Sequence, residues 1–264
     1  MSGVTEDLDL LLAAAREAGE AALGYFGKRP RTWPKGKSIV SEADLAVDRM
    51  LTDRLRPARP DYGWLSEETA DHPDRLDRRR VFVVDPIDGT RDFLDGGDEW
   101  TVALAVVEDG RPIVGVVFAP VRTEIYAAAL GAGSRCNGKA IHVSAVADLR
   151  ESRFAASGRY GRHTARAVGF EETAVRFVPS LAYRFTMVAA ARLDFAVSAP
   201  GSHDWDLAAA DLLVQEAGGA VNDLAGRPLR YNGQNPRHPA IVASNAALRP
   251  SVTALVAEVD RRLN

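Results

Sequence analysis

The chain has 264 residues and contains little that points to disulfide, thiolate or membrane chemistry. Its single cysteine, Cys136, excludes an internal disulfide and a thiolate metal cluster. Cys136 lies in the turn-like stretch GSRCNGK, where a structural role is expected. No apolar run approaches the roughly 18–20 residues that span a bilayer, and the N-terminal segment carries acids where a signal peptide carries bases. The sequence therefore predicts a soluble, cytoplasmic protein without a membrane partner.

The chain also lacks a large excess of charge of either sign. Its net charge of -3 and pI near 6.0 give no general attraction to nucleic acid polymers or to anionic lipid. A small anionic substrate would have to be held by local positive charge. With 46% hydrophobic residues, the chain is long enough to bury a large core as one domain or two packed halves.

Hydrophobic spacing predicts a mixed α/β (α+β) chain in two halves. In residues 1–150 we expect a helix over 5–26 with Thr5 as its N-cap, a basic loop over 29–44, and a second helix capped by Ser41. A β-rich region follows, with strands expected at 81–85, 101–107, 113–121, 124–130 and 140–144. Residues 151–264 alternate, with helices expected at 180–193, 205–217 and 251–263 and strands at 194–198, 220–223 and 240–244. No flexible linker marks the boundary near residue 150.

The segment VFVVDPIDGTRDF, residues 81–93, ends a predicted buried strand with two carboxylates, Asp85 and Asp88. Like charges repel, and each carboxylate loses hydration near the interior. One interpretation is a plain Asp-Gly turn. A second interpretation is a cation between the two carboxylates, with Gly89 and Thr90 offering main-chain N–H groups to an anion.

Two further acids favour the cation. Glu67 follows an apolar pair in WLSEE, and Asp206 begins a long apolar helix, where it is alternatively a helix-dipole acid. An all-oxygen set suits Mg²⁺ or Mn²⁺, and shared carboxylates are typical of two-metal phosphoryl chemistry. The spacing does not fit an aspartyl-phosphate phosphatase or an EF-hand loop.

With these residues assembled, the chain resembles the inositol monophosphatase superfamily. The resemblance rests on VVDPIDGTRDF and WDLAAADLLVQEAGG, and it extends over nearly the whole chain. It implies a layered αβαβα sandwich with the active site between the two halves. It also implies a Mg²⁺-dependent, lithium-sensitive phosphomonoesterase that acts on a small phosphorylated substrate and forms a homodimer.

The resemblance implies a role for each matched residue. One ion would be held by Glu67, Asp85 and the carbonyl of Ile87. A second would be held by Asp85, Asp88 and Asp206, and Glu67 would reach a weaker third ion through water. Asp88, Gly89 and Thr90 would hold the phosphate. Asp44 and the Thr90 hydroxyl would activate the attacking water.

The substrate is less well specified. Inositol monophosphatases carry an acid seven positions before the last metal aspartate, whereas this chain has Ala199. Arg184 occupies a place where bisphosphate nucleotidases tend to have a base, although it could equally be a solvated helix arginine. We therefore favour a 3′(2′),5′-bisphosphate nucleotide over inositol 1-phosphate and histidinol phosphate, which stay open. His203 is a further candidate substrate contact.

The sequence leaves two points open. Lys35 and Lys37 form either a basic flap over the site or a plain solvated loop. The chain is either an enzyme or a non-catalytic, metal-binding regulatory protein with the same fold. Asp44 and Thr90 favour the enzyme, because they add nothing to metal binding but are what water activation requires.

Overall fold

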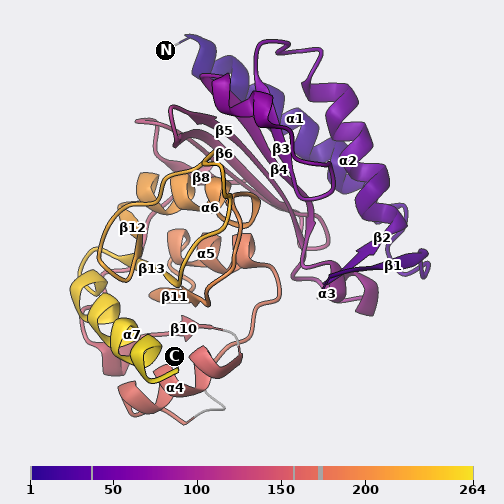
Figure 1. Cartoon of the computed structure of the whole chain (residues 1–264). Coiled ribbons are helices and arrows are strands. Elements are labelled where there is room, and N and C mark those ends of the chain that lie inside the picture. The colour runs from indigo at the N-terminus through magenta and orange to yellow at the C-terminus, as the bar shows by residue number, and fades with distance from the viewer. Residues whose placement is uncertain (1, 37, 157, 172–174, 264) are drawn as a thin grey trace.

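We describe a computed structural model that covers residues 2–36, 38–156, 158–171 and 175–263 (Figure 1). Its helices are α1 (Ser2–Leu23), α2 (Glu42–Leu55), α3 (Thr90–Asp95), α4 (Gly158–Val168), α5 (Leu181–Ala189), α6 (Asp204–Glu216) and α7 (Arg249–Leu263), with 3-10 turns η1 (Pro73–Asp77) and η2 (Leu149–Glu151). Its strands are β1 (Thr32–Lys35), β2 (Ser38–Ser41), β3 (Gly63–Ser66), β4 (Arg80–Asp88), β5 (Thr101–Glu108), β6 (Arg111–Ala119), β7 (Glu124–Ala129), β8 (Ser134–Cys136), β9 (Lys139–Ile141), β10 (Phe154–Ala155), β11 (Phe195–Ser198), β12 (Gly219–Asp223) and β13 (Ile241–Asn245).

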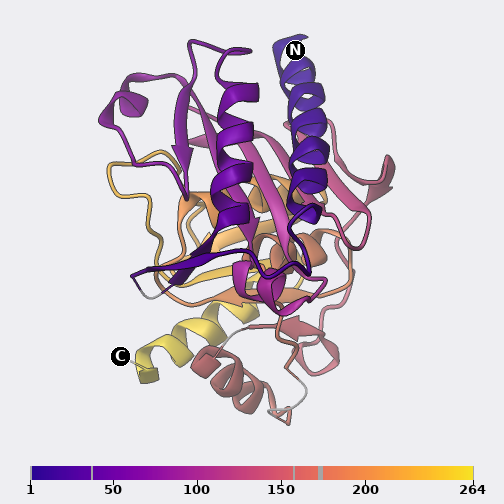
Figure 2. The same ribbon diagram turned by 90° about the vertical axis from the view of Figure 1, so that its right-hand side faces the viewer.

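Two sheets and three helical layers alternate through the molecule. The larger sheet has the strand order β3-β4-β5-β6-β7-β8-β9, and the smaller has β10-β11-β13-β12. Helices α1 and α2 run side by side over one face of the larger sheet (Figure 2). Helices α5 and α6 lie between the sheets, and α4 and α7 cover the outer face of the smaller one. This arrangement confirms the predicted αβαβα sandwich, while the boundary near residue 150 stays a prediction.

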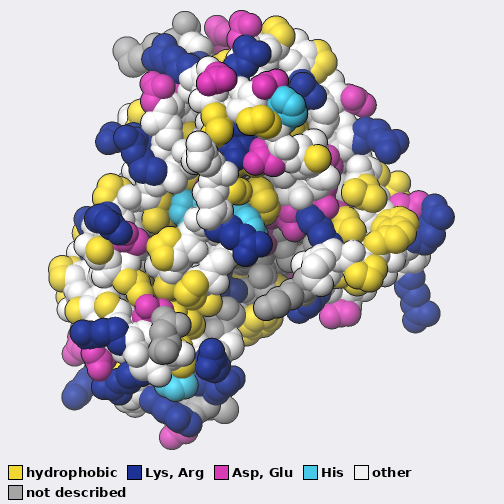
Figure 3. All heavy atoms as spheres, viewed as in Figure 1, with side chains coloured by type: hydrophobic (Ala, Val, Ile, Leu, Met, Phe, Trp, Pro, Cys, Tyr) yellow, Lys and Arg dark blue, Asp and Glu magenta, His cyan; other side chains and the backbone are white. Residues whose placement is uncertain are grey.

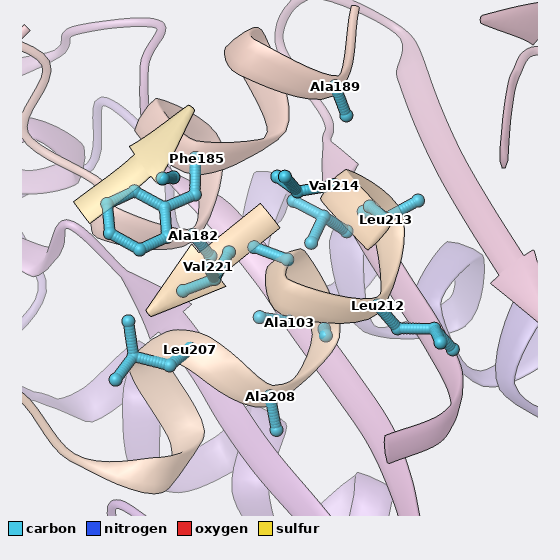
Figure 4. Packing of buried hydrophobic residues seen from close by; sticks show 14 of the residues in the cluster. Ala103, Ala182, Phe185, Ala189, Leu207, Ala208, Leu212, Leu213, Val214 and Val221 are labelled. Atoms are coloured by element: carbon cyan, nitrogen blue, oxygen red, sulfur yellow. The ribbon is translucent and has the colours of Figure 1, made fainter. Parts of the chain in front are cut away.

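The layer between the sheets is held by close apolar packing. Ala182, Phe185 and Ala189 of α5 lie near Leu207, Leu213 and Val214 of α6 in one buried cluster (Figure 4). Helix α6 approaches β6 closely, because Gly115 has no side chain. A Cβ atom added there would lie 2.5 Å from the carbonyl oxygen of Ala209. The glycine therefore sets how near the helix that carries Asp206 comes to the larger sheet.

The start of α2 forms as its sequence predicts. The Ser41 side chain accepts from the main-chain N–H of Ala43 and Asp44, and the Asp44 carboxylate accepts from the Ser41 N–H in return. This capping box satisfies N–H groups that a helix start leaves unpaired. It also fixes Asp44 in a buried position, 1% exposed.

Four local predictions need correction. Helix α1 begins at Ser2, so Thr5 is not its N-cap, and the nearby Asp7 is buried against arginines. The basic segment before α2 contains the hairpin β1–β2 and not only a loop, with Lys37 outside the described residues. Cys136 ends strand β8, which pairs with β7. The strand expected at 140–144 ends at Ile141.

Among the described residues, no helix has the length and apolar composition needed to cross a bilayer.

Candidate metal and phosphate site

Three carboxylates meet where β4 ends and α6 begins. Asp85, Asp88 and Asp206 each offer an oxygen within 4.8 Å of the other two. Asp85 and Asp88 belong to β4, whereas Asp206 lies in the first turn of α6. The site therefore joins the larger sheet to the helical layer between the sheets. The fold brings together acids that are far apart in the sequence.

A β-bulge brings the two β4 carboxylates to one side. In a regular strand, residues an odd number of positions apart point to opposite faces. Here Asp85 pairs with Ala103 and Asp88 with Thr101, so three positions on β4 oppose two on β5. The extra residue reverses the alternation, and both side chains reach the same cluster.

The Asp85 carboxylate is the least compensated group in the site. It is 1% exposed, and among the described residues neither of its oxygens has a hydrogen-bond partner. Burial, then repulsion by Glu67 and Asp88, raises its pKa well above the usual value. A buried carboxylate without a partner is costly, whereas two free oxygens beside further carboxylates suit a hard divalent cation.

Neighbouring acids are shifted in the same direction. Burial and repulsion by Asp206 raise the pKa of Asp88 to about 7. Burial raises the pKa of Glu67 to about 8. The positive charge of Lys35 opposes this shift, and repulsion by Asp206 adds to it. These carboxyl groups hold protons near neutral pH unless positive charge joins them. The donor set is therefore one that a Mg²⁺ or Mn²⁺ ion fits.

Glu67 lies beside the cluster rather than within its 4.8 Å group. It follows β3, and its main-chain N–H donates to the carbonyl of Val84 on β4 over 3.1 Å. Lys35, from the hairpin β1–β2, donates to the Glu67 carboxylate over 3.2 Å and to Glu68 over 2.9 Å. An ammonium ion thus neutralises this side of the site.

Asp44 and Thr90 form a hydrogen-bonded pair next to the carboxylate cluster. The Thr90 hydroxyl lies 3.0 Å from Asp44 Oδ1 and 3.1 Å from the carbonyl oxygen of Ile87. Burial raises the pKa of Asp44, although hydrogen bonds from Ser41 and Thr90 oppose the shift. Because the hydroxyl donates towards these acceptors, its lone pairs stay available to accept from a water.

The turn after Asp88 depends on α5, a contact that the sequence did not predict. Asp88 Oδ2 accepts from the Ser180 hydroxyl and the Ala182 N–H, both over 2.7 Å, and Ser180 caps α5. Gly89 has a φ of 94°, and a Cβ there would lie 3.3 Å from the Ser180 nitrogen. Only glycine fits this close approach readily. The predicted helix start at residue 180 agrees with Ser180 as the cap, and only the contact with Asp88 was missed.

A cavity of about 550 Å³ opens over these groups. On the face shown in Figure 3, the surface is hollowed between the part that carries α3 and the lower part that carries α4 and α7. The cavity is lined by Ser38, Glu67, Ile87, Asp88, Gly89, Thr90, Arg91, Asp92, Asp95, Phe177, Pro179 and Asp206. Predicted metal and phosphate residues thus share one cavity with residues from the second half of the chain.

The structure describes the surroundings of the two predicted substrate contacts, whose roles stay predictions. Arg184 is 4% exposed, and its guanidinium donates to the carbonyl oxygens of Val178 and Val197. Its hydrogen-bonding groups are used inside the protein, which argues against contact with a second phosphate. The His203 ring stacks on Trp205 with centroids 4.5 Å apart, and its main-chain N–H donates to Asp206. Neither residue lines the described cavity.

The layered fold and the buried carboxylates define an α/β sandwich protein with an acidic cluster that could hold a metal ion. A model of the inositol monophosphatase family matches residues 4–261. The chain is 33% identical to the fructose-1,6-bisphosphatase/inositol-1-monophosphatase of Thermotoga maritima, with 96% of each chain covered. It is 31% identical to a histidinol-phosphatase of Chlorobaculum parvum, covering 98% of this chain and 99% of that protein.

Two further comparisons agree. The chain is 32% identical to the 3′(2′),5′-bisphosphate nucleotidase of Shigella flexneri, covering 85% of this chain and 93% of that protein. The solved structure of a Thermotoga maritima IMPase superposes with a TM-score of 0.86 at 31% identity, covering 98% of this chain and 100% of that one. The chain belongs to the inositol monophosphatase family, whose members are phosphatases that hydrolyse phosphate monoesters.

Proposed function

We propose that the protein is a Mg²⁺-dependent phosphomonoesterase that hydrolyses a small phosphorylated molecule with water as the nucleophile. The observation that carries this proposal is Asp85, a buried carboxylate with two unpartnered oxygens inside a three-carboxylate cluster among the described residues. Such a group is stable in its charged form only beside a cation.

Two or three Mg²⁺ ions would be held by this chain's oxygen ligands, with Mn²⁺ as a substitute. The ligands are the carboxylates of Glu67, Asp85, Asp88 and Asp206 and the carbonyl of Ile87. A bound divalent cation neutralises the ester dianion and lowers the pKa of water. Gly89 and Thr90 line the cavity, and their main-chain N–H groups would bind the phosphate oxygens.

The water is oriented by Thr90 and Asp44. A water hydrogen donates to the Thr90 hydroxyl oxygen, and the hydroxyl proton points to Asp44 Oδ1. A proton leaving the water then passes through the hydroxyl to the carboxylate. The raised pKa of Asp44 makes its carboxylate a stronger base for this proton.

The particular ester is left open by the relatives, whose names include an inositol monophosphatase, a histidinol-phosphatase and a bisphosphate nucleotidase. The preference for a bisphosphate nucleotide rested on Arg184 and on Ala199, which stands where inositol monophosphatases carry an acid. The burial of Arg184 weakens the first ground, and the preference stays a prediction. A homodimer, lithium sensitivity and a cytoplasmic location stay predictions.

Phosphate release tests the proposal. Glycerol 2-phosphate, inositol 1-phosphate, histidinol phosphate and 3′-phosphoadenosine 5′-phosphate are assayed with and without Mg²⁺. We expect phosphate release to depend on Mg²⁺. We expect Asp85→Asn to lower kcat/KM by about 10³-fold or more, because a carboxylate that binds the ion directly lowers the activation barrier of hydrolysis by several kcal/mol. Asp53→Asn, a change at an exposed carboxylate of α2, is the matched control. Release without Mg²⁺, or full activity of Asp85→Asn, contradicts the proposal.

A further inference from the structure

Phe177 is an aromatic side chain exposed at the catalytic cavity. It is 62% exposed, and it lines the cavity together with Pro179. A single exposed apolar residue is common on protein surfaces and needs no explanation by itself. The position of this one is informative, because an aromatic ring at a ligand cavity offers a flat apolar face where a bound molecule lies.

The main chain holds Phe177 in this position from both sides. On one side, the Arg176 guanidinium forms an ion pair with Glu99. On the other side, Val178 is fully buried, and its carbonyl oxygen accepts from Arg184 Nε over 3.1 Å. Residues that flank Phe177 are thus anchored, and the ring between them points away from the core.

Apart from Ile87 and Gly89, the other residues that line the cavity are polar or charged. Helix α3 contributes Arg91, Asp92 and Asp95, and the carboxylate cluster forms the inner end. The outer cavity therefore has an apolar surface on the side of Phe177 and Pro179 and polar groups on the side of α3. A planar heteroaromatic ring matches both, because its faces are apolar and its edge carries nitrogen atoms. Glycerol has no ring, and the ring of inositol is saturated and carries an oxygen on every carbon, so neither offers an aromatic face to stack.

We propose that Phe177 is a specificity-determining residue that stacks on a planar heteroaromatic ring in the leaving group of the phosphate ester. The inference rests on the proposed phosphatase function, and it narrows the substrate to esters that carry a nucleobase or an imidazole. The cavity of about 550 Å³ is larger than a phosphate group requires, so it has room for such a ring beyond the cleaved bond.

The test compares two classes of substrate in the full-length, Mg²⁺-loaded enzyme. Adenosine 3′-monophosphate and histidinol phosphate carry a heteroaromatic ring, whereas glycerol 2-phosphate and inositol 1-phosphate do not. We expect Phe177→Ala to lower kcat/KM for the first class by roughly 5- to 150-fold, the range that a base–aromatic contact carries, mainly through KM. We expect turnover of the second class to change less than about twofold.

Three further variants sharpen the result. Phe177→Trp keeps a stacking face and is expected to retain the preference for ring-bearing esters, while Phe177→Leu keeps apolar bulk and is expected to lose it. Leu130→Ala, at a residue 61% exposed outside the cavity, is the matched control and is expected to change neither class. Melting temperatures check that every variant is folded.

The outcomes separate the two proposals. If all four esters lose activity equally in Phe177→Ala, or if neither class changes, the stacking role is overturned while the phosphatase function stands. A wild-type enzyme that prefers inositol 1-phosphate or glycerol 2-phosphate over both ring-bearing esters also overturns it. If the wild-type enzyme hydrolyses none of the esters with Mg²⁺, the proposed function fails, and the inference built on it fails as well.

Discussion

The ammonium group of Lys35 lies 2.7 Å from the main-chain oxygen of Glu67 and 3.2 Å from its carboxylate. A side chain from the β1–β2 hairpin thus holds positive charge beside a predicted metal ligand. A cation that binds Glu67 meets this charge, so the two compete for the carboxylate.

Removing the ammonium group should tighten Mg²⁺ binding. For Lys35→Gln we expect the Kd of Mg²⁺ to fall by roughly three- to tenfold, because a like charge near the ion is lost. Isothermal titration calorimetry measures the Kd. Arg31→Gln, a loss of the same charge at an exposed ion pair with Glu42, is the control and should leave the Kd unchanged. Weaker Mg²⁺ binding by Lys35→Gln would show that the lysine supports the ion.

The Thr90 hydroxyl gives a prediction about catalysis. Thr90→Val removes the group between the water and Asp44 and should lower kcat by about 10²-fold or more, the size of general-base effects. Thr90→Ser keeps the hydroxyl and should retain most activity. Calorimetric Mg²⁺ affinity should stay within about threefold for both variants. Equal kcat values for the valine and serine variants would remove Thr90 from the water-activating pair.

Asp211 gives a prediction about pH. This carboxyl on α6 is buried and accepts from Tyr231 and Gln215, and burial raises its pKa to about 6 from a usual 3.8. A raised carboxyl pKa means that the folded state binds the proton more tightly. The resulting stability is present at low pH and is lost as pH rises through about 6.

Urea unfolding of the wild type and Asp211→Asn, both with saturating Mg²⁺, measures this loss. Between pH 5 and pH 8, the wild type should lose about 1.4 kcal/mol of unfolding free energy relative to the variant, which has no proton to release. A difference between the two proteins that is independent of pH would mean that Asp211 titrates alike in the folded and unfolded chains.

Arg184 is expected to act on stability. Its guanidinium donates to two buried carbonyl oxygens, and burial lowers its pKa to about 10. Arg184→Met leaves those carbonyls unpaired and should lower the free energy of unfolding by about 2–4 kcal/mol, as measured in urea. Arg184→Lys should recover part of the loss. If Arg184→Met were fully stable but lost only turnover of 3′-phosphoadenosine 5′-phosphate, a role in substrate binding would be restored.

The close approach of α6 to β6 yields a packing prediction. Gly115→Ala places a Cβ atom 2.5 Å from a main-chain oxygen and 3.1 Å from the Ala209 Cα, so helix or sheet must shift. We expect a loss of about 1–3 kcal/mol in unfolding free energy. Gly3→Ala, whose Cβ would meet only the end of the Arg80 side chain at 3.6 Å, is the control and should be neutral or slightly stabilising.

How far the sequence could be interpreted depended on the kind of signal. Periodicity and caps located α2, α6, and the hairpin of β5 and β6, because those signals are local. Helix α4 was not predicted, since GRYGRHTARAV has little apolar content and its buried face depends on α7. Segment 29–44 contains proline, glycine and basic residues that are typical of a loop. Its two strands, β1 and β2, form by pairing with each other.

The residues of the candidate site also differ in how well the sequence could identify them. The acids Asp85, Asp88 and Asp206 stand out because two signatures contain them, and the fold brings them together. Ser180 was missed because its role lies in a contact with Asp88 across 92 positions of sequence. Arg184 was weighed equally as a substrate contact and as a solvated helix arginine, and its burial was not foreseen, because a helix arginine looks alike in sequence whether it faces solvent or the core. Only tertiary packing distinguishes the two.

The bulge between Asp85 and Asp88 has a consequence for tolerance to change. Adding one residue here while the bulge persists would place the two acids four positions apart and direct one of them to the opposite face of the sheet. The apolar core on that face would then receive an ionised group. Single-residue insertions here should abolish folding and activity together, whereas conservative replacements of Pro86 should be accepted.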